Sequence, residues 1–179
     1  MTTDAGTVPR LTARELAVWR MLLRTHASIT SQLERDLVAE HGLPLAWYDV
    51  LLQLAEAPGQ RLRMTDLAGR VLLSRSGLTR LVDRLVTEGL AERAACPNDA
   101  RGTFSVLTPT GLQRLREAAP THLRGIAEHI SEPLTDQELD TLGGLLGKLL
   151  AASGADDSEP AGGCGAAEGL VAGQARPPA

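Results

Sequence analysis

Residues 74–90 read SRSGLTRLVDRLVTEGL, a helical repeat of apolar residues that also carries three arginines. On a helical wheel the apolar side chains share one face, which predicts a core-packing helix ending at Gly89. This face consists of Leu78, Leu81, Val82, Leu85 and Val86. The opposite face is polar and consists of Ser76, Arg80, Asp83, Arg84 and Thr87, with Thr79 at its edge.

The segments on either side of this helix predict a small compact motif. A short strand in RLRM (61–64) and a short helix from Asp66 to Leu72, capped by Thr65, come before it. After Gly89, LAERAA (90–95) and TFSVLT (103–108) alternate in polarity, and CPNDARG (96–102) between them favours a turn. Short helix, tight turn, helix and β-hairpin is the order of a winged helix-turn-helix.

Longer helices are predicted outside this motif. Thr12 and Glu15 have capping-box spacing at the start of a helix that runs to Gly42, and a second helix spans about 45–57. A third begins at Thr108-Pro109 and runs towards Ile130 with a kink at Pro120, and a fourth runs from Thr135 to near Ser153. The predicted fold is therefore mainly α with a small β-hairpin.

Composition and charge point to one domain with a local basic region. The chain has 179 residues, is 43% hydrophobic and carries a net charge of −4. Residues 61–101 hold eight arginines against five acidic residues, a local charge of +3, so the remaining residues carry −7. A local basic footprint of this kind is typical of nucleic-acid binding even in an acidic protein.

Several other classes of protein are disfavoured. MTTDAGTVPR (1–10) does not resemble a signal peptide, no run is apolar enough to cross a bilayer, and two cysteines do not suggest a disulfide framework, so we expect a cytoplasmic protein without a membrane partner. Neither a nucleophile elbow, a zinc-protease motif nor a phosphate-binding loop occurs, so we expect no enzyme and no cofactor.

The run from Ser74 to Gly111 resembles the MarR family of bacterial transcriptional regulators. LTRLVDRL-x-x-x-GL (78–90) is similar to the family's recognition helix, and D-x-R-G (99–102) followed by VLT-x-x-G (106–111) is similar to its wing and the start of the next helix. HGLPLAWYDVLLQL (41–54) is similar to the family's junction between the first two helices. The resemblance covers about residues 11–150.

This resemblance implies a homodimer that binds double-stranded DNA at a pseudo-palindromic operator. Within a domain of residues 11–153, segments of about 11–41 and 108–153 would form the dimer, and about 45–107 would form the DNA-binding lobe. Independently of the resemblance, the Gly/Ala/Pro-rich composition of 154–179, without an apolar period, predicts a disordered tail, and we also expect disorder at 1–10. Arg101 would be the wing arginine and Asp99 its structural companion, although many relatives carry a further basic residue where this chain has Ala100. The recognition-helix contacts would be Ser74, Arg75, Ser76, Thr79, Arg80 and Arg84.

The family typically acts as a repressor that a small phenolic or lipophilic ligand releases from DNA. The ligand binds a crevice between the dimerisation helices and the winged helix. Candidate pocket residues on the first two helices are Trp19, His26, Trp47, Tyr48 and Asp49, although Trp19 and Trp47 fit core or dimer packing equally well.

Two alternatives remain open. A winged helix can serve as a protein-interaction module without DNA binding, which the arginines of residues 74–85 disfavour. A redox-responsive or metal-responsive variant of the same regulator would use Cys96 or the pair His122 and His129. A metal needs three or four ligands, and no third is evident near the two histidines, so we expect no metal site.

Overall fold

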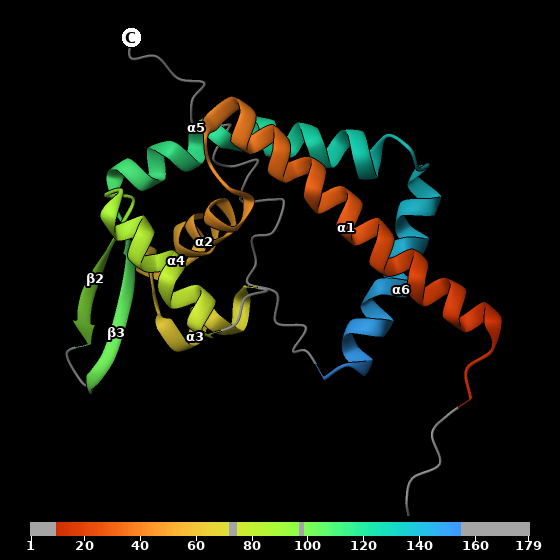
Figure 1. Cartoon of the computed structure of the whole chain (residues 1–179), viewed down its shortest axis with the longest axis horizontal. Coiled ribbons are helices and arrows are strands. Elements are labelled where there is room, and N and C mark those ends of the chain that lie inside the picture. The colour runs from red at the N-terminus through yellow and green to blue at the C-terminus, as the bar shows by residue number, and fades with distance from the viewer. Residues whose placement is uncertain (1–9, 72–74, 97–98, 155–179) are drawn as a thin grey trace, which may run out of the picture.

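The computed structural model describes residues 10–71, 75–96 and 99–154, and gives the backbone but not the side chains of Arg75 and of residues 99–101. Six α-helices, one 3₁₀ turn, one π-helical turn and a three-stranded sheet make up this part of the chain (Figure 1). The chain order is α1 (Ala13–His41), α2 (Leu45–Glu56), η1 (Pro58–Gln60), β1 (Arg61–Arg63), α3 (Met64–Arg70), α4 (Arg75–Thr87), β2 (Ala91–Cys96), β3 (Asp99–Leu107), α5 (Pro109–Ile126), η2 (Ala127–Ser131) and α6 (Asp136–Ala152). The mainly α fold with a β-hairpin wing is thus confirmed.

The predicted helix ends agree with the structure where a local cap defines them. Thr12 forms a capping box with Glu15 at the start of α1, and Thr135 forms one with Glu138 at the start of α6. Gly42 ends α1 in the left-handed conformation, with φ of 60°, which glycine adopts without a steric penalty. Most of the segments predicted to be disordered, 1–10 and 154–179, lie outside the described residues.

The helix predicted from Asp66 to Leu72 starts and ends earlier than the sequence suggested. α3 spans Met64–Arg70, and its N-cap residue is Arg63, which makes no side-chain capping bond. Thr65 was predicted to cap this helix, but its hydroxyl lies 3.1 Å from Asp66 Oδ1. The start is displaced because β1 pairs with β3 up to Arg63, and the chain turns directly from this strand into the helix.

The hairpin is longer than predicted. β3 is the central strand, with β1 and β2 antiparallel on either side of it, and it begins at Asp99 rather than Thr103. Cys96 pairs with Asp99 after a register shift at Ala95, so part of the expected turn belongs to the strands. The polar residues of this stretch have weak strand propensity, and the cross-strand pairing outweighs it.

The core of the winged-helix lobe lies between α2, α4, the sheet and the first half of α5. The apolar face of α4 packs into it as predicted: Leu78, Val82 and Leu85 are almost completely buried, and Val86 packs against them. Gln53 and Ser105 are the buried polar residues of this lobe in the described chain. The sequence of α4 therefore defines which of its faces is left for a partner.

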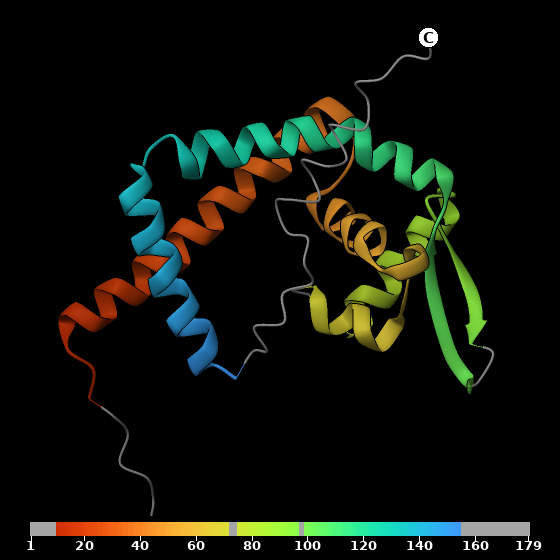
Figure 2. The same cartoon turned by 180° about the vertical axis from the view of Figure 1, so that it is seen from behind.

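α5 links this lobe to the rest of the molecule. Thr108 caps its first turn by accepting a hydrogen bond from Gly111 N at 2.9 Å, and Pro109 occupies the first position as predicted. The α-helix passes through Pro120, ends at Ile126 and continues as the π-helical turn η2, so it stops short of the predicted Ile130. Figure 2 shows the change of direction between the first and second halves of α5.

Polar contacts fasten the end of α1 to the middle of α5. Thr121 Oγ1 donates to Glu40 Oε2 and lies 2.8 Å from His41 Nε2, while Arg114 donates to the His41 carbonyl at 2.6 Å. Arg124 also pairs with Glu40. Beyond this junction the first half of α1 and all of α6 extend away from the winged-helix lobe (Figures 1 and 2).

Candidate nucleic-acid interface

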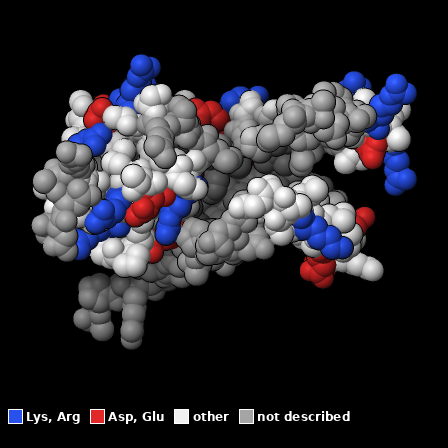
Figure 3. All heavy atoms as spheres, turned by 90° about the horizontal axis from the view of Figure 1, so that it is seen from below, with Lys and Arg blue, Asp and Glu red and all other residues white. Residues whose placement is uncertain are grey.

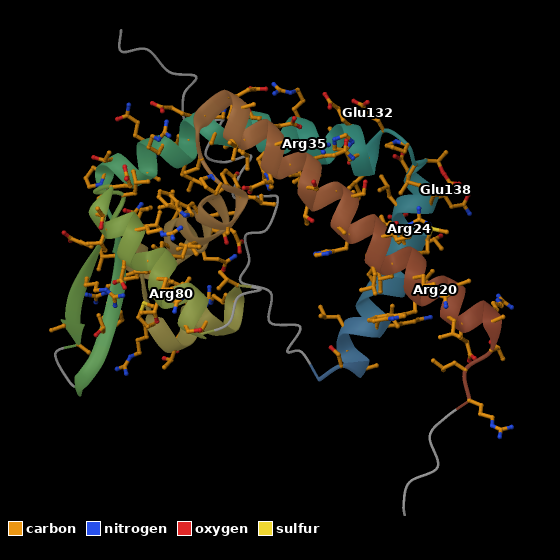
Figure 4. All side chains as sticks on the ribbon, in the orientation of Figure 1. Arg20, Arg24, Arg35, Arg80, Glu132 and Glu138 are labelled. Carbon is orange, nitrogen blue, oxygen red and sulfur yellow. The ribbon has the colours of Figure 1, made fainter. Side chains whose placement is uncertain are left out.

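The outer face of α4 is polar and open to solvent. Ser76, Thr79, Arg80 and Arg84 are all exposed, and they come from successive turns of one helix. Arg80 projects from α4 at the opposite end of the molecule from Arg20 and Arg24 on α1 (Figure 4). Of the other residues predicted to contact DNA from this helix, Ser74 and the side chain of Arg75 lie outside the described part.

The wing lies beside α4 as a two-stranded extension of the sheet (Figure 1). The backbone of Asp99 and Arg101 belongs to β3, close to where β2 and β3 meet. Their side chains lie outside the described part, so the wing contact of Arg101 and the supporting salt bridge of Asp99 stay predictions.

An ion pair joins α4 to the wing. Arg93 of β2 donates from its terminal nitrogen to Asp83 Oδ1 of α4 at 2.8 Å. Both side chains are partly accessible, 32% for Arg93 and 59% for Asp83. An exposed pair of this kind adds little stability, but it orients the guanidinium beside the outer face of α4. Sequence analysis placed Asp83 on this face and assigned no role to Arg93.

Two more arginines support the base of the wing. The guanidinium groups of Arg61 and Arg63 lie 5.1 and 5.7 Å from the centre of the Phe104 ring, within the range of cation–π contact. Arg63 also donates to Cys96 Sγ at 3.2 Å, and Cys96 is buried. The sequence counted Arg61 and Arg63 in the basic region but gave them no individual role; the alternation of arginine and apolar residues in RLRM was the signal that both side chains lie on one face of a strand.

The winged-helix part of the surface carries several basic groups. Figure 3 shows several arginine side chains on this part of the lower face, with a few carboxylates between them, and further basic side chains at the opposite end of the molecule. This distribution agrees with the excess of arginine between residues 61 and 101. The face can therefore attract a polyanion although the whole chain is acidic.

A second feature is a hollow of about 780 Å³ between α1, α2, α5 and the end of α3. It contains three of the five residues predicted for a ligand pocket, His26, Tyr48 and Asp49. It also contains polar residues that sequence analysis did not select for the pocket: Thr30, Ser31, Glu34, Arg70 and His122. The sequence suggested His122 only as a candidate metal ligand. Its helix is far from α1 and α2 along the chain, so no local pattern indicated that it lines the same hollow.

Two titratable groups of this hollow, His122 and Asp49, lie in low-polarity surroundings. The His122 ring packs on Tyr48, with 4.3 Å between ring centres, and burial lowers the pKa of His122 to about 4. His122 Nδ1 is buried without a hydrogen-bond partner among the described residues. Burial raises the pKa of Asp49, while Glu34 Oε2 accepts a hydrogen bond from Leu45 N at 2.5 Å at the start of α2. An apolar ligand with a few polar groups suits this lining.

The two tryptophans proposed for the pocket lie elsewhere. Trp19 is 54% exposed and lines a separate groove between α1 and α6, because seven residues of helix place it about 10 Å from His26 along α1. Trp47 packs against the core of the lobe, since consecutive residues on a helix point about 100° apart and Tyr48 faces the hollow. The alternative interpretation was core or dimer packing: the position of Trp47 agrees with core packing, and dimer packing of Trp19 stays a prediction.

The two histidines considered as a metal pair line different hollows. His122 faces the hollow beside Tyr48, whereas His129 lies in η2 and lines a shallow hollow with residues of α1. The π-helical turn that starts at Ala127 breaks the spacing that would place them on one face. No group of three metal-binding side chains occurs in residues 10–71, 75–96 and 99–154. In the same ranges no helix is long and apolar enough to span a membrane.

Comparison with known proteins places this geometry among transcriptional regulators. A model described as the MarR family matches residues 41–102. The HTH-type transcriptional regulator MhqR of Bacillus subtilis is 30% identical over 130 residues, 73% of this chain and 87% of the relative. The HTH-type transcriptional repressor YetL of the same species is 28% identical over 149 residues, 83% of this chain and 88% of the relative.

Solved structures give the same result. The structure of Sco3205, a MarR family transcriptional regulator from Streptomyces coelicolor in complex with DNA, is 35% identical and has a TM-score of 0.76. It covers 83% of this chain and 92% of its own. A mutant MarR from Escherichia coli, complexed with operator DNA, is 26% identical over 79% of this chain and 99% of its own, with a TM-score of 0.69.

Proposed function

Since the chain belongs to the MarR family of transcriptional regulators, we propose that it is a homodimeric, sequence-specific DNA-binding protein that represses transcription in the cytoplasm. The observation that carries this proposal is the division of α4 into two faces. Its leucines and Val82 are buried in the lobe, and the side chains of Ser76, Thr79, Arg80 and Arg84 are exposed on the outside. An α-helix with such a polar face fits the major groove of B-DNA.

Different residues of α4 would contact the bases and the phosphates. Arg80 and Arg84 are the candidates for base readout, because arginine binds guanine through two hydrogen bonds. Ser76 and Thr79, with Ser74, are suited to phosphate contacts, which position the helix without specifying a sequence. Arg75 and the wing residue Arg101 would add contacts at the edges of the site. In this proposal Arg101 enters a minor groove.

The homodimer is supported by the apolar surface of α1 and α6. No residue of α6 is buried, although this helix carries five leucines that are each more than a third exposed. Trp19, Leu22 and Leu149 line a groove that both helices share. An exposed apolar surface of this size marks an interaction site. A second copy would bury these side chains, which are Val18, Trp19, Met21, Leu22, Leu23, Leu142, Leu145, Leu146, Leu149 and Leu150.

A small phenolic or lipophilic ligand would act through the hollow beside His122. The hollow is lined by α1 and α5 on the dimerisation side and by α2 and Arg70 of α3 on the DNA-binding side. Two recognition helices must lie about 34 Å apart to reach successive major grooves. A ligand wedged between the two parts would change that separation and lower the affinity for DNA, which is a coupling between two sites.

Selection of duplexes from a random pool by the purified full-length protein tests the proposal. We expect enrichment of a pseudo-palindrome with half-sites one helical turn apart, and binding that weakens steeply as salt is raised. Recovery of no sequence preference at moderate salt would favour the alternative, a winged helix that serves as a protein-interaction module.

The ligand part of the proposal has its own test. Salicylate and other phenols would be titrated into the complex of the protein with its selected duplex. We expect release of DNA and a rise in the melting temperature of the free protein, because a ligand that binds the folded state stabilises it. If no phenol in the panel changes either quantity, the proposal of ligand release is refuted and the proposal of DNA binding is unaffected.

A further inference from the structure

A small hollow lies between the start of α3, the outer edge of α4 and the base of the wing. Its volume is about 230 Å³, and five of its residues have polar side chains: Arg63, Thr65, Thr79, Arg93 and Thr103. The residues come from β1, α3, α4, β2 and β3, so the tertiary fold brings them together. The recognition contacts proposed above use Thr79 alone from this set, and we call the set the wing-base notch.

The two arginines of the wing-base notch are held by neighbouring groups. Arg93 donates to Asp83 at 2.8 Å, which engages one of the five N–H donors of a guanidinium and leaves others for a further acceptor. Arg63 donates to Cys96 Sγ and lies over the Phe104 ring. Because these contacts orient both guanidinium groups before a ligand arrives, less side-chain entropy is lost on binding.

The charge and size of the notch suit one anionic group. Two guanidinium groups and three hydroxyls surround a space with less than a third of the volume of the hollow beside His122. Of the nearby carboxylates, Asp83 is paired with Arg93, and Asp66 accepts a hydrogen bond from the Thr65 hydroxyl at 3.1 Å, which uses the one donor of that hydroxyl. Arginine and hydroxyl side chains are the usual donors to phosphate oxygens.

The position of the notch relates it to DNA. Thr79 belongs to both the notch and the outer edge of α4, and Arg80 follows it on the exposed face. A duplex that receives this face of α4 in its major groove would place the sugar–phosphate backbone at the edge of that groove next to the wing. We propose that the wing-base notch binds one phosphodiester of each half-site through Arg93, and that Asp83 is a positioning residue for that arginine. This inference rests on the proposed DNA-binding function.

The proposal is tested by the salt dependence of binding, with the duplex selected by the wild-type protein and a scrambled duplex of the same length. Each phosphate neutralised contributes about 0.9 to the slope of log affinity against log salt. Arg93→Ala removes two contacts per dimer, so we expect the slope to fall by about 1.8 and affinity to fall at least about tenfold near ~0.1 M salt. Both duplexes should be affected by the same factor, because a phosphate contact carries no sequence information.

Three controls separate a phosphate contact from a structural role. Arg93→Lys keeps the charge and should keep most of the wild-type slope, while Arg116→Ala, on the exposed surface of α5, should change nothing. Asp83→Asn removes the ion pair but not the arginine, so it should weaken binding mildly with the slope retained. Thermal unfolding of each variant reports whether the lobe is intact.

The outcomes are distinct. An unchanged slope for Arg93→Ala, or an Asp83→Asn variant that reproduces its full loss, would overturn the notch as a phosphate site, with the DNA-binding function untouched. If Arg93→Ala lowers the affinity for the selected duplex only, the phosphate site is also overturned, since such a loss would indicate base readout. A wild-type protein that enriches no duplex in the selection would instead refute the proposed function itself.

Discussion

At the scale of single residues, Arg80 of α4 is a proposed base-reading residue. Arg80 is exposed on the outer face of α4, and no partner from the described residues holds it there. We predict that Arg80→Ala costs about 1–3 kcal/mol in binding to the selected operator and relaxes specificity at one base pair per half-site. Competition binding against duplexes with all four base pairs at each position measures both effects. Equal losses for operator and random DNA would contradict base readout by Arg80.

Gly111 allows the close approach of α5 to the turn between α4 and β2. A Cβ atom at this position would lie 2.0 Å from the Leu90 carbonyl oxygen and 2.9 Å from Leu107 Cδ1. The Leu90 carbonyl also accepts a hydrogen bond from Thr108 N, so this backbone cannot move away freely.

We predict that Gly111→Ala lowers the free energy of unfolding by about 1–3 kcal/mol, as overpacking does. Urea denaturation gives the measurement. Gly69→Ala on α3 is the matched control, since a Cβ there meets nothing within 4 Å and alanine favours helix by up to about 1 kcal/mol. A Gly111→Ala variant as stable as the Gly69→Ala variant would show that the turn can relax.

At the scale of elements, helix packing changes the chemistry of side chains. His122 of α5 packs on the ring of Tyr48 of α2. Burial lowers the pKa of this histidine from its ordinary value of 6.5 to about 4. Below about pH 6.5 the unfolded chain therefore binds a proton that the folded chain does not accept until about pH 4. The free energy of unfolding therefore falls as the pH is lowered from about 6.5 to about 4, because in this range the unfolded chain binds more protons than the folded chain.

We predict that His122→Phe reduces the acid sensitivity of the protein. The difference in the free energy of unfolding between pH 7 and pH 4.5 should shrink by on the order of 2 kcal/mol, because phenylalanine fills a similar space and does not titrate. Denaturant titrations at several pH values compare the variant with the wild type. The raised pKa of Asp49 acts in the opposite direction in both proteins, so the comparison isolates His122. Parallel stability profiles for the two proteins would contradict the prediction.

The elements that the sequence described well are those with local signals. The capping residues Thr12, Thr108 and Thr135 each satisfy backbone donors within three residues, so the starts of α1, α5 and α6 could be read from short stretches. α3 and β3 were misjudged because their ends depend on pairing between segments about 40 residues apart in the chain. Arg63 pairs with Phe104 in the sheet, and no local pattern reports such a partner.

At the scale of the whole molecule, the projecting part of α1 and α6 needs a partner. Leu146 and Leu149 of α6 face a groove shared with Trp19, and each is more than 40% exposed. We predict that Leu146→Glu weakens or abolishes the dimer, since a charge buried without a partner is costly. Operator binding should fall with it, because a single winged helix loses the second half-site.

Sedimentation velocity of the purified variant measures its oligomeric state. Arg116→Glu, a charge reversal on the exposed surface of α5, is the control and should stay dimeric. A Leu146→Glu protein that sediments as the wild-type dimer would place the interface elsewhere.

The sequence alone indicated the order of the elements, the capped helix starts, the buried and exposed faces of α4, and the likeness to a family of regulators. Helical periodicity and capping act over a few residues, so these features can be read along the chain. The tertiary structure decided which distant groups meet: His122 with Tyr48, Arg93 with Asp83, and the polar lining of both hollows. Periodicity identifies the face a residue occupies but not the side chain that will lie opposite, because packing between elements chooses that partner. For this reason Trp19 and Trp47 were assigned to the right helices but do not line the larger hollow.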